Sequence, residues 1–334
     1  MTKKITVPPV LHPAWRLVLV AVAAVAFMVV AGQAQAQDFP SKPIKFIVPF
    51  PPGSGTDTSA RYFAKKLSEL TGQPVVVENK PGANGFIAVR SVLSAPADGY
   101  TVFVGSISTL AVNTALFKAL PYDPVADFAP LTMLMRAPAL LIVPATSSYK
   151  SMADLIAAAR AQPDRLDYGA GSAGYQLMAE LFNESAKVQT HHVPYKGASE
   201  AITAVVSGTV QMAFADVTGS FELVKGGKLR ALAVASERRL SALPGVPTAA
   251  EAGLPGFTAY IWVAAVVAAK TPKPEVDKLA ALMSKIEALP ETREFYERLG
   301  AEVMPSGPEE MRTFQNAEIQ LWKRIAAKAK VEQQ

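Results

Sequence analysis

The chain has 334 residues, half of them hydrophobic, and carries a formal net charge of +5 with no cysteine. Lys3, Lys4 and Arg16 are the only charged residues among the first 36, so the remainder, with 30 basic and 28 acidic residues, carries only +2. This near-neutral remainder has no basic run, so it lacks the charge pattern of a nucleic-acid-binding protein. The absence of cysteine excludes disulfides, thiolate metal sites and a lipid on an N-terminal cysteine.

The N-terminal segment is typical of a secretory signal. Basic residues precede an apolar run at residues 17–31, and Ala34-Gln35-Ala36 offers the small residues of a signal-peptidase site. The apolar run is shorter than the ~20 residues that a membrane-spanning helix needs. We therefore expect residues 1–36 to be a signal peptide, cleaved after Ala36, and the mature chain to be a free soluble protein.

Beyond residue 36, short β-branched runs alternate with helical patterns, which predicts an α/β fold with parallel sheets covered by helices. The remaining length suits two domains. Strands are predicted at residues 44–49, 74–78, 101–105, 131–135, 139–144, 166–169, 191–194, 212–215 and 229–235. Helices are predicted at residues 57–70, 84–94, 151–162, 176–186, 198–207, 274–289 and 308–328.

The turn after the first strand is the most informative segment, and it reads PFPPGSGTD at residues 49–57. A strand that runs into such a turn and then into a helix directs several free backbone N–H groups toward one point, where an anion is favoured. Glycine lets a ligand approach the main chain, and Ser54 and Thr56 add hydroxyl donors. The same residues also fit a well-capped helix start with nothing bound.

Two places in the sequence indicate that the chain crosses between domains. Two strand-like runs follow each other across Arg136-Ala137-Pro138 with no helix between them, and a second crossing is predicted near Trp262. Domain one then comprises residues 37–136 plus 263–334, and domain two comprises residues 137–262. A ligand cleft is expected between the two lobes, where strand ends and helix N-termini face each other.

The second domain repeats the strand, glycine-serine turn and helix pattern, with YGAGSAGYQ at residues 168–176. Gly171, Ser172, Ala173 and Gly174 would supply main-chain N–H groups, so two turns in different lobes could hold two carboxylates of one small molecule. The turn GSIST at residues 105–109, which contains Ser106, is a further candidate. An ordinary helix cap explains that turn equally well.

The residues disfavour an enzyme. AGSAG at residues 170–174 is one residue from a nucleophile elbow, but no histidine follows His192, and in α/β-hydrolases the histidine comes last. GSGT at residues 53–56 has no lysine to make a phosphate-binding loop. His191 and His192 would point to opposite faces of a strand, so they are a poor metal pair. We predict no catalytic residue, no metal site and no cofactor.

Several long motifs together resemble one protein family. They are PFPPGSGTD at 49–57, VVENKPGANG at 76–85, ADGYT at 97–101, VPYKG at 193–197, GKLRALAV at 227–234 and LPGVPT at 243–248 followed by EAG at 251–253. These motifs resemble the Bug family, the periplasmic substrate-binding proteins of tripartite tricarboxylate transporters, over essentially the whole mature chain. The resemblance implies a two-lobed, hinge-closing periplasmic binding protein of type II. Such a protein holds a small carboxylate, a di- or tricarboxylate or an aromatic one, through backbone amides, hydroxyls and waters.

The resemblance also implies delivery of the ligand to the membrane subunits of the transporter, by a protein expected to be a monomer in the periplasm. A sensing protein of the same fold that signals to a membrane sensor kinase remains the alternative. Asp216 follows an apolar strand and either accepts a hydrogen bond from a ligand or caps the next helix, the cap being slightly favoured. The predicted ligand-binding residues are Phe50, Gly53, Ser54, Gly55, Thr56, Asp57, Ser106, Gly171, Ser172, Ala173, Gly174, Tyr175, Tyr195 and Asp216.

Overall fold

A computed structural model describes residues 39–163 and 165–334 of the chain. The chain divides into a short N-terminal part, Met1–Ser41, and one compact unit, Lys42–Gln334, which contains all the helices and strands given below. The predicted signal peptide, residues 1–36, lies outside the described residues. Within the described residues, no helix combines the length and the apolar character that crossing a membrane requires.

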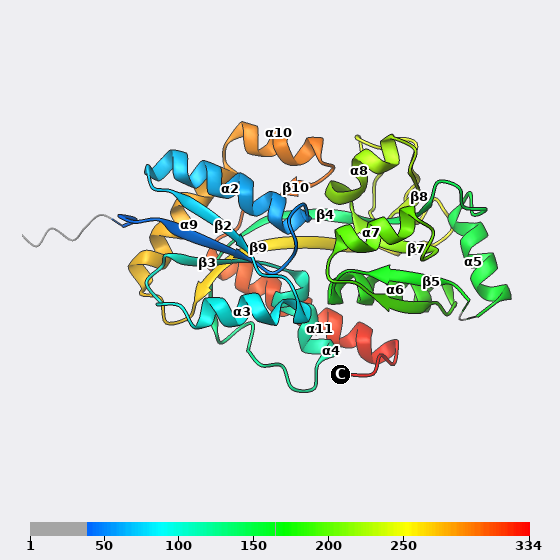
Figure 1. Ribbon diagram of the computed structural model, residues 1–334, viewed down its shortest axis with the longest axis horizontal. Coiled ribbons are helices and arrows are strands. Elements are labelled where there is room, and N and C mark those ends of the chain that lie inside the picture. The colour runs from blue at the N-terminus through cyan, green and yellow to red at the C-terminus, as the bar shows by residue number, and fades with distance from the viewer. Residues whose placement is uncertain (1–38, 164) are drawn as a thin grey trace, which may run out of the picture. The chain divides into compact units, whose positions relative to one another are not determined.

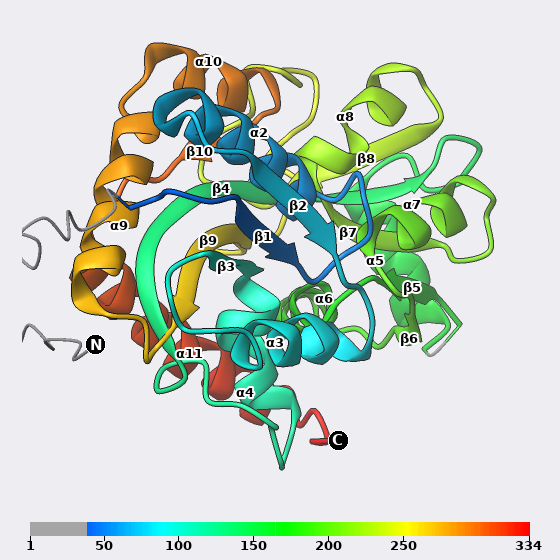
Figure 2. The same ribbon diagram turned by 60° about the vertical axis from the view of Figure 1, so that its left-hand side comes forward.

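The first lobe is built on a sheet in the order β2-β1-β3-β9-β4 (Figures 1 and 2). Strands β1 (Ile44–Val48), β2 (Val75–Asn79) and β3 (Thr101–Ser106) are parallel, and β9 (Tyr260–Ala268) is antiparallel to β3 and to β4 (Phe128–Pro144). A short strand, β10 (Glu302–Val303), pairs with β4. The helices of this lobe are α2 (Gly55–Thr71), η1 (Ala83–Gly85), α3 (Phe86–Leu93), η2 (Ser108–Val112), α4 (Asn113–Leu116), α9 (Lys273–Glu287), α10 (Pro290–Arg298) and α11 (Pro308–Lys328).

The second lobe repeats the same arrangement. Strands β5 (Asp167–Ala170), β6 (His191–Pro194) and β7 (Met212–Asp216) are parallel in the order β7-β5-β6, and β8 (Leu229–Val234) pairs with β4. The helices are α5 (Met152–Ala161), α6 (Ala173–Ala186), α7 (Ala198–Val206) and α8 (Val217–Lys225). In each lobe the first strand therefore lies between the second and the third, and right-handed crossovers place the two connecting helices on opposite faces of the sheet. Figure 1 shows this for α2 and α3.

Strand β4 belongs to both sheets. Residues Phe128–Pro138 pair with β9, and Ala139 begins the pairing with β7. The prediction of two separate strands interrupted at residues 136–138 was therefore wrong. Pro138 has no N–H group, but in an antiparallel pair only alternate residues need to donate to a given partner, so the strand continues through it. Strand β9, which the sequence indicated only as a crossing near Trp262, completes the first sheet.

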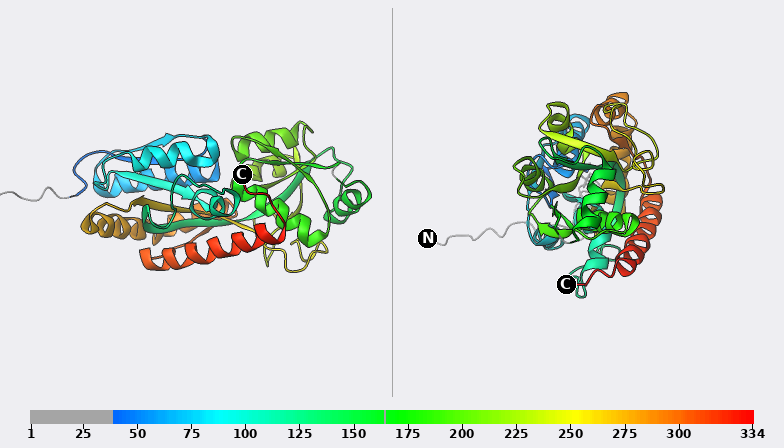
Figure 3. Two further views of the ribbon diagram at one scale, coloured as in Figure 1. Left: turned by 90° about the horizontal axis from the view of Figure 1, so that it is seen from below. Right: turned by 90° about the vertical axis from the view of Figure 1, so that its right-hand side faces the viewer.

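Helix α2 shows how the local sequence sets the elements. Ser54 caps its first turn, and Gly72 ends it in the left-handed conformation at φ 69°. Ala60, Phe63 and Leu67 recur at helical spacing and are fully buried against the sheet. Helix α11 buries Met311, Trp322 and Ile325, and it contacts both β4 and α6, the latter in the second lobe (Figure 3).

Candidate ligand-binding site

A cavity lies between the lobes. It lies at the carboxyl ends of β1, β3, β5 and β7. In each lobe the chain continues to one side of the first strand and then to the other, and the ends of strands at such a point are the expected ligand position in an α/β sheet. The first lobe contributes Phe50, Ser54, Gly55, Thr56, Ser106, Ile107, Ser108 and Ile261, and the second lobe contributes Gly171, Ser172, Gly174, Tyr175, Ala198 and Asp216.

Most of the predicted residues meet at this cavity. Of the fourteen, the exceptions are Gly53, Asp57, Ala173 and Tyr195, which are not among its lining residues. The sequence prediction did not include four residues that line the cavity: Ile107, Ser108, Ala198 and Ile261. Ser108 lies in the turn that was named for Ser106, and Ala198 follows the VPYKG motif, so both had a signal in the sequence. Ile261 had none, because it reaches the cavity through β9. Contact of these residues with a ligand stays a prediction.

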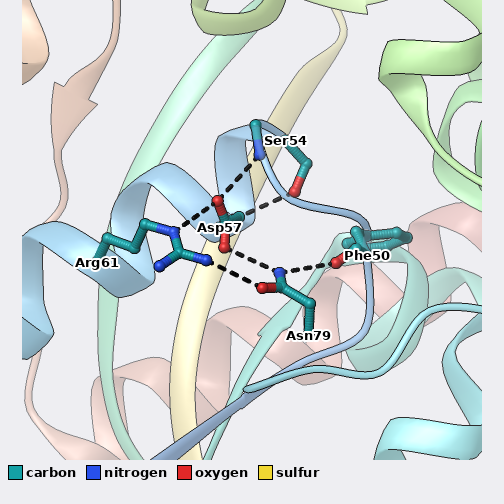
Figure 4. Close-up of polar contacts among 6 residues, drawn as sticks. Phe50, Ser54, Asp57, Arg61 and Asn79 are labelled. Carbon is teal, nitrogen blue, oxygen red and sulfur yellow. Dashed lines mark hydrogen bonds and ion pairs between the residues drawn. The ribbon is translucent and has the colours of Figure 1, made fainter. Parts of the chain in front are cut away.

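The first-lobe turn is held by a polar network within its own lobe (Figure 4). The Asp57 N–H donates to Ser54 Oγ at 3.2 Å, which caps α2. In return, the Asp57 carboxylate accepts from the Gly53 N–H at 2.9 Å and from Arg61 Nε at 3.0 Å. Asn79 Nδ2 donates to Asp57 Oδ1 at 2.8 Å and to the Phe50 carbonyl at 2.9 Å. Apart from Ser54, the side chains that fix this turn, those of Asp57, Arg61 and Asn79, do not line the cavity.

Asp57 remains charged at the centre of this network. Burial disfavours its ionised form, but the hydrogen bonds from Arg61, Gly53 and Asn79 outweigh that cost and hold the pKa of the carboxyl below its usual value. The Asp57 side chain is 3% exposed. Its carboxylate therefore points into the turn and supports the N-terminus of α2. The main-chain N–H groups of Gly55 and Thr56, at the start of that helix, lack an intrahelical partner.

The second-lobe turn is capped in a different way. Ser172 is the N-cap residue of α6, but its side chain makes no cap hydrogen bond. Instead, the Gly174 N–H donates to Ser108 Oγ of the first lobe at 3.0 Å, and Ser108 Oγ donates to Ser172 Oγ at 3.0 Å. Gly171 lies against the main chain of Gly197, where a Cβ on Gly171 would be 2.1 Å from the Gly197 carbonyl carbon. Glycine is needed at this position for the close approach of two backbone segments.

Three helix N-termini therefore surround the cavity. Gly55 and Thr56 begin α2, Gly174 and Tyr175 lie in the first turn of α6, and Ala198 begins α7. The first N–H groups of a helix carry partial positive charge, so this arrangement favours an anion. No lysine, arginine or histidine is among the described residues that line the cavity. An anion there would be held by main-chain N–H groups and hydroxyls.

Asp216 is a buried carboxylate at the wall of this cavity, with 2% exposure. It caps α8, as the sequence slightly favoured, because its Oδ1 accepts from the Gly219 N–H at 2.7 Å and from the Thr218 hydroxyl. Its Oδ2 accepts from the Tyr175 hydroxyl at 2.5 Å. Burial and the neighbouring Asp216 charge raise the pKa of Tyr175 well above its usual value, so the phenol keeps its proton and remains a donor.

A second cavity adjoins the first and shares Phe50, Gly171 and Ser172 with it. Tyr195 lies here, together with the exposed side chain of Lys196. On the first-lobe side the wall is the segment 82–85, in which all four residues have positive φ. This second cavity lies between the segment 82–85 of the first lobe and residues 194–196 of the second.

The two histidines of the second lobe contact different partners. His191 Nδ1 contacts Asp167 Oδ1 at 3.2 Å, whereas the His192 ring stacks on Tyr168 with 5.1 Å between ring centroids. Burial, together with the charge of His191, lowers the pKa of His192 to about 4. No group of three or more metal-ligating side chains suited to a metal ion is found among the described residues.

Two parallel three-stranded units, joined by β4 and β9 with a cavity between them, define the class of two-lobed periplasmic binding proteins. The family model described as "Tripartite tricarboxylate transporter family receptor" matches residues 59–331. The chain therefore belongs to this receptor family, and its motifs and relatives place it among the Bug proteins. Protein BugT of Bordetella pertussis is 35% identical over 302 residues, covering 88% of this chain and 91% of BugT.

Solved structures agree with this assignment. The structure titled "R. palustris Rpa4515 with adipate" is 33% identical, covers 89% of this chain and 100% of its own, and gives a TM-score of 0.86. A structure of the periplasmic binding protein BugD covers 89% of this chain and 100% of its own at 29% identity, with a TM-score of 0.84. MatC from Rhodopseudomonas palustris, with bound malate, is 31% identical, covers 86% of this chain and 99% of its own, and gives a TM-score of 0.81.

Proposed function

We propose that this protein is a periplasmic receptor that captures a small carboxylate in the cavity between its lobes. The observation that carries the proposal is the convergence of the N-termini of α2, α6 and α7 on a cavity whose described lining residues include no cationic side chain. Adipate and malate in the two Rhodopseudomonas structures support a carboxylate ligand. The protein would hold this ligand without transforming it.

The ligand contacts that we propose are the ten predicted residues that line the cavity, together with Ser108 and Ala198. The ligand carboxylate would accept from the free N–H groups of Gly55 and Thr56 and from Ala198 N–H. A charged oxygen is disfavoured next to the Asp216 carboxylate, so we expect the acidic end of the ligand to lie toward α2 and α7. The opposite end would face Asp216 and Tyr175.

The proposed receptor role also implies where the protein works and to which partner it passes the ligand. Residues 1–36 would direct export and be removed, and the mature monomer would pass its ligand to the membrane subunits of a tripartite transporter. We also propose lobe boundaries at residues 136/137 and 262/263. β4 changes from pairing with β9 to pairing with β7 at residues 138/139, within two residues of the first boundary, and Arg136 pairs with Trp262 beside both boundaries.

The test is a thermal-shift and calorimetric screen of residues 37–334 against mono-, di- and tricarboxylates, including adipate and malate. The matched controls are the corresponding diamides, which have the same shape without charge. A ligand at 100 times its dissociation constant should add ~2.7 kcal/mol to the free energy of unfolding. If the diamides stabilise the protein as well as the acids do, or if no acid stabilises it, the cavity is not an anion site.

A further inference from the structure

Around the cavity, the lobes face each other at three points where one partner is a glycine. A Cβ on Gly55 of the first lobe would lie 2.8 Å from Thr218 Oγ1 of the second lobe. A Cβ on Gly174 of the second lobe would lie 3.0 Å from Ser108 Oγ of the first. In both cases the glycine lies just after the first parallel strand of one lobe, β1 or β5. It faces residues just after the third parallel strand of the other lobe, β7 or β3, so the two contacts are reciprocal.

The third contact lies between Gly197 of the second lobe and the rigid ring of Pro51 in the first lobe. Gly197 is the N-cap of α7 in the second lobe, and a Cβ there would lie 2.7 Å from Cδ and 3.0 Å from Cγ of Pro51 in the first-lobe turn. A proline ring is held by its own backbone and cannot rotate away. Neither Gly197 nor Pro51 is among the residues that line the two cavities between the lobes.

Backbone conformation does not explain why glycine stands at these positions. Gly197 has φ −170°, an extended conformation that any residue adopts, and Gly55 and Gly174 lie in ordinary helical first turns. The missing side chain matters because of the space it leaves for the opposite lobe. Ser108 adds a hydrogen bond to the Gly174 contact, because its hydroxyl accepts from the Gly174 N–H across the cleft.

We propose that Gly55, Gly174, Gly197 and Ser108 form a closure seam, in which Gly197 against Pro51 sets how closely the lobes can approach. Gly197 is thus a positioning residue for ligand capture that does not touch the ligand. The seam refines the proposed function and rests on it for its ligand-dependent part. A methyl group at residue 197 would hold the lobes apart, so the closed form would become rare and the apparent affinity would fall by the same factor.

The absence of cysteine from the sequence allows a direct measurement of lobe separation. Spin labels are attached at Ile87→Cys on α3 and Val206→Cys on α7, two exposed positions in different lobes. The distance distribution is recorded by double electron–electron resonance without ligand and with each acid of the carboxylate screen. The variants are Gly197→Ala, the matched control Gly307→Ala and the double variant Gly197→Ala/Pro51→Ala. Gly307 is also an extended N-cap glycine, but a Cβ there would meet nothing within 4 Å.

We expect Gly197→Ala to lower the short-distance population, and the apparent affinity, at least about tenfold, because a population shift changes apparent affinity in proportion. Gly307→Ala should behave as the wild type, and Pro51→Ala should restore closure to Gly197→Ala. Unchanged distances in Gly197→Ala would overturn the proposal, as would failure of Pro51→Ala to rescue, or a wild-type protein with no short-distance population under any condition. Failure of the carboxylate proposal would show instead as a seam that closes normally while no acid binds.

Discussion

The turns after β1 and β5 occupy equivalent places in the two lobes and use the same residue types, yet they are stabilised differently. In the first lobe, Ser54 caps α2 and the Asp57 carboxylate ties the turn to Arg61 and Asn79. In the second lobe, Ser172 makes no cap bond to α6, and the cap comes from Ser108 of the other lobe.

The difference indicates a division of labour during ligand capture. The first turn is pre-organised by its own lobe, so it can present its N–H groups before the lobes meet. The N-terminus of α6 obtains its hydroxyl cap only from the opposite lobe, so the second turn is completed by closure. We therefore expect substitutions in the first turn to affect both stability and binding, and substitutions in the second turn to affect mainly closure and binding.

The largest expected effect is that of Gly55→Val. The added side chain would meet Thr218 Oγ1 and Asp216 Oδ1 across the cleft, at 2.8 Å and 3.3 Å from the Cβ position alone. Overpacking and blocked access to the main-chain N–H groups should together cost about 4 kcal/mol of binding, or ~1000-fold in affinity. Calorimetry with an acid from the screen measures this loss.

Gly245→Val is the control for that measurement, since a Cβ on Gly245 has nothing within 4 Å and its φ is not positive. It should bind as the wild type does. Circular dichroism must show that Gly55→Val is folded. A folded Gly55→Val protein that binds with wild-type affinity would remove the first turn from the site.

The second prediction concerns a buried carboxyl group of the first lobe. Burial, only partly offset by the hydrogen bond from Thr132, raises the pKa of Glu287 to about 8. Thr132 Oγ1 lies 2.7 Å from Glu287 Oε1 and 2.8 Å from the Ser306 carbonyl. A hydroxyl has one proton to donate, so both contacts are satisfied together when Glu287 is protonated.

Because the folded state holds this proton more tightly than the unfolded state, the stabilisation is complete below about pH 4.5 and is lost as the pH rises to about 8. At ~1.4 kcal/mol per pH unit, the loss between pH 5 and pH 8 should be on the order of 4 kcal/mol in the free energy of unfolding. Glu287→Gln keeps a polar partner for Thr132 without a titrating proton. Its urea-unfolding profile from pH 5 to 9 should be flatter than that of the wild type, and equal slopes would contradict the assignment.

The third prediction separates the network of the first turn from simple helix capping. Asp57 and Asp154 occupy the same position in two capping sequences, Ser54-x-x-Asp57 and Ser151-x-x-Asp154. Asp57 also binds Arg61 and Asn79, whereas Asp154 is at an exposed helix start. Asp57→Ala should cost ~1.5–3 kcal/mol in the free energy of unfolding, the value of hydrogen bonds to a buried charge. Asp154→Ala should cost clearly less, and equal losses in urea titrations would show that the network adds nothing.

The sequence predicted the elements that have local signals. Alternating runs and glycine-hydroxyl turns identified both three-stranded units, because strand periodicity and turn chemistry are encoded within a few residues. β9 was not recognised, because its central residues Ile261–Val267 are an uninterrupted apolar run buried on both faces, which fits a strand or a helix equally. β4 was divided across residues 136–138, because two strand-like runs with no helix between them were interpreted as a crossing between domains and not as one long strand.

The candidate site was likewise predicted only where its residues carry a local sequence signal. The two turns were found, but the cap from Ser108 to α6 joins residues 66 positions apart, and no local pattern encodes such a pairing. Asp57 was predicted as a ligand contact because it belongs to the glycine-hydroxyl turn at residues 49–57. Its carboxylate instead reaches Asn79, 22 positions away on β2, which only the folded sheet brings near.

The smallest expected effect compares the two N-cap serines directly. Ser54→Ala removes a cap that α2 uses, so it should lower the free energy of unfolding by about 1 kcal/mol, the usual cost of losing a serine cap. Ser172→Ala should leave the free energy of unfolding unchanged within ~0.5 kcal/mol, because the Ser172 side chain caps nothing. It loses only the contact with Ser108 across the cleft, so any effect should appear in the affinity for the acid and in the distance distribution of the spin-labelled protein. Equal losses of stability in the two variants, measured side by side in urea, would mean that α6 is capped from within its own lobe in solution. In that case the contrast between a pre-organised first turn and a second turn completed by closure would not hold.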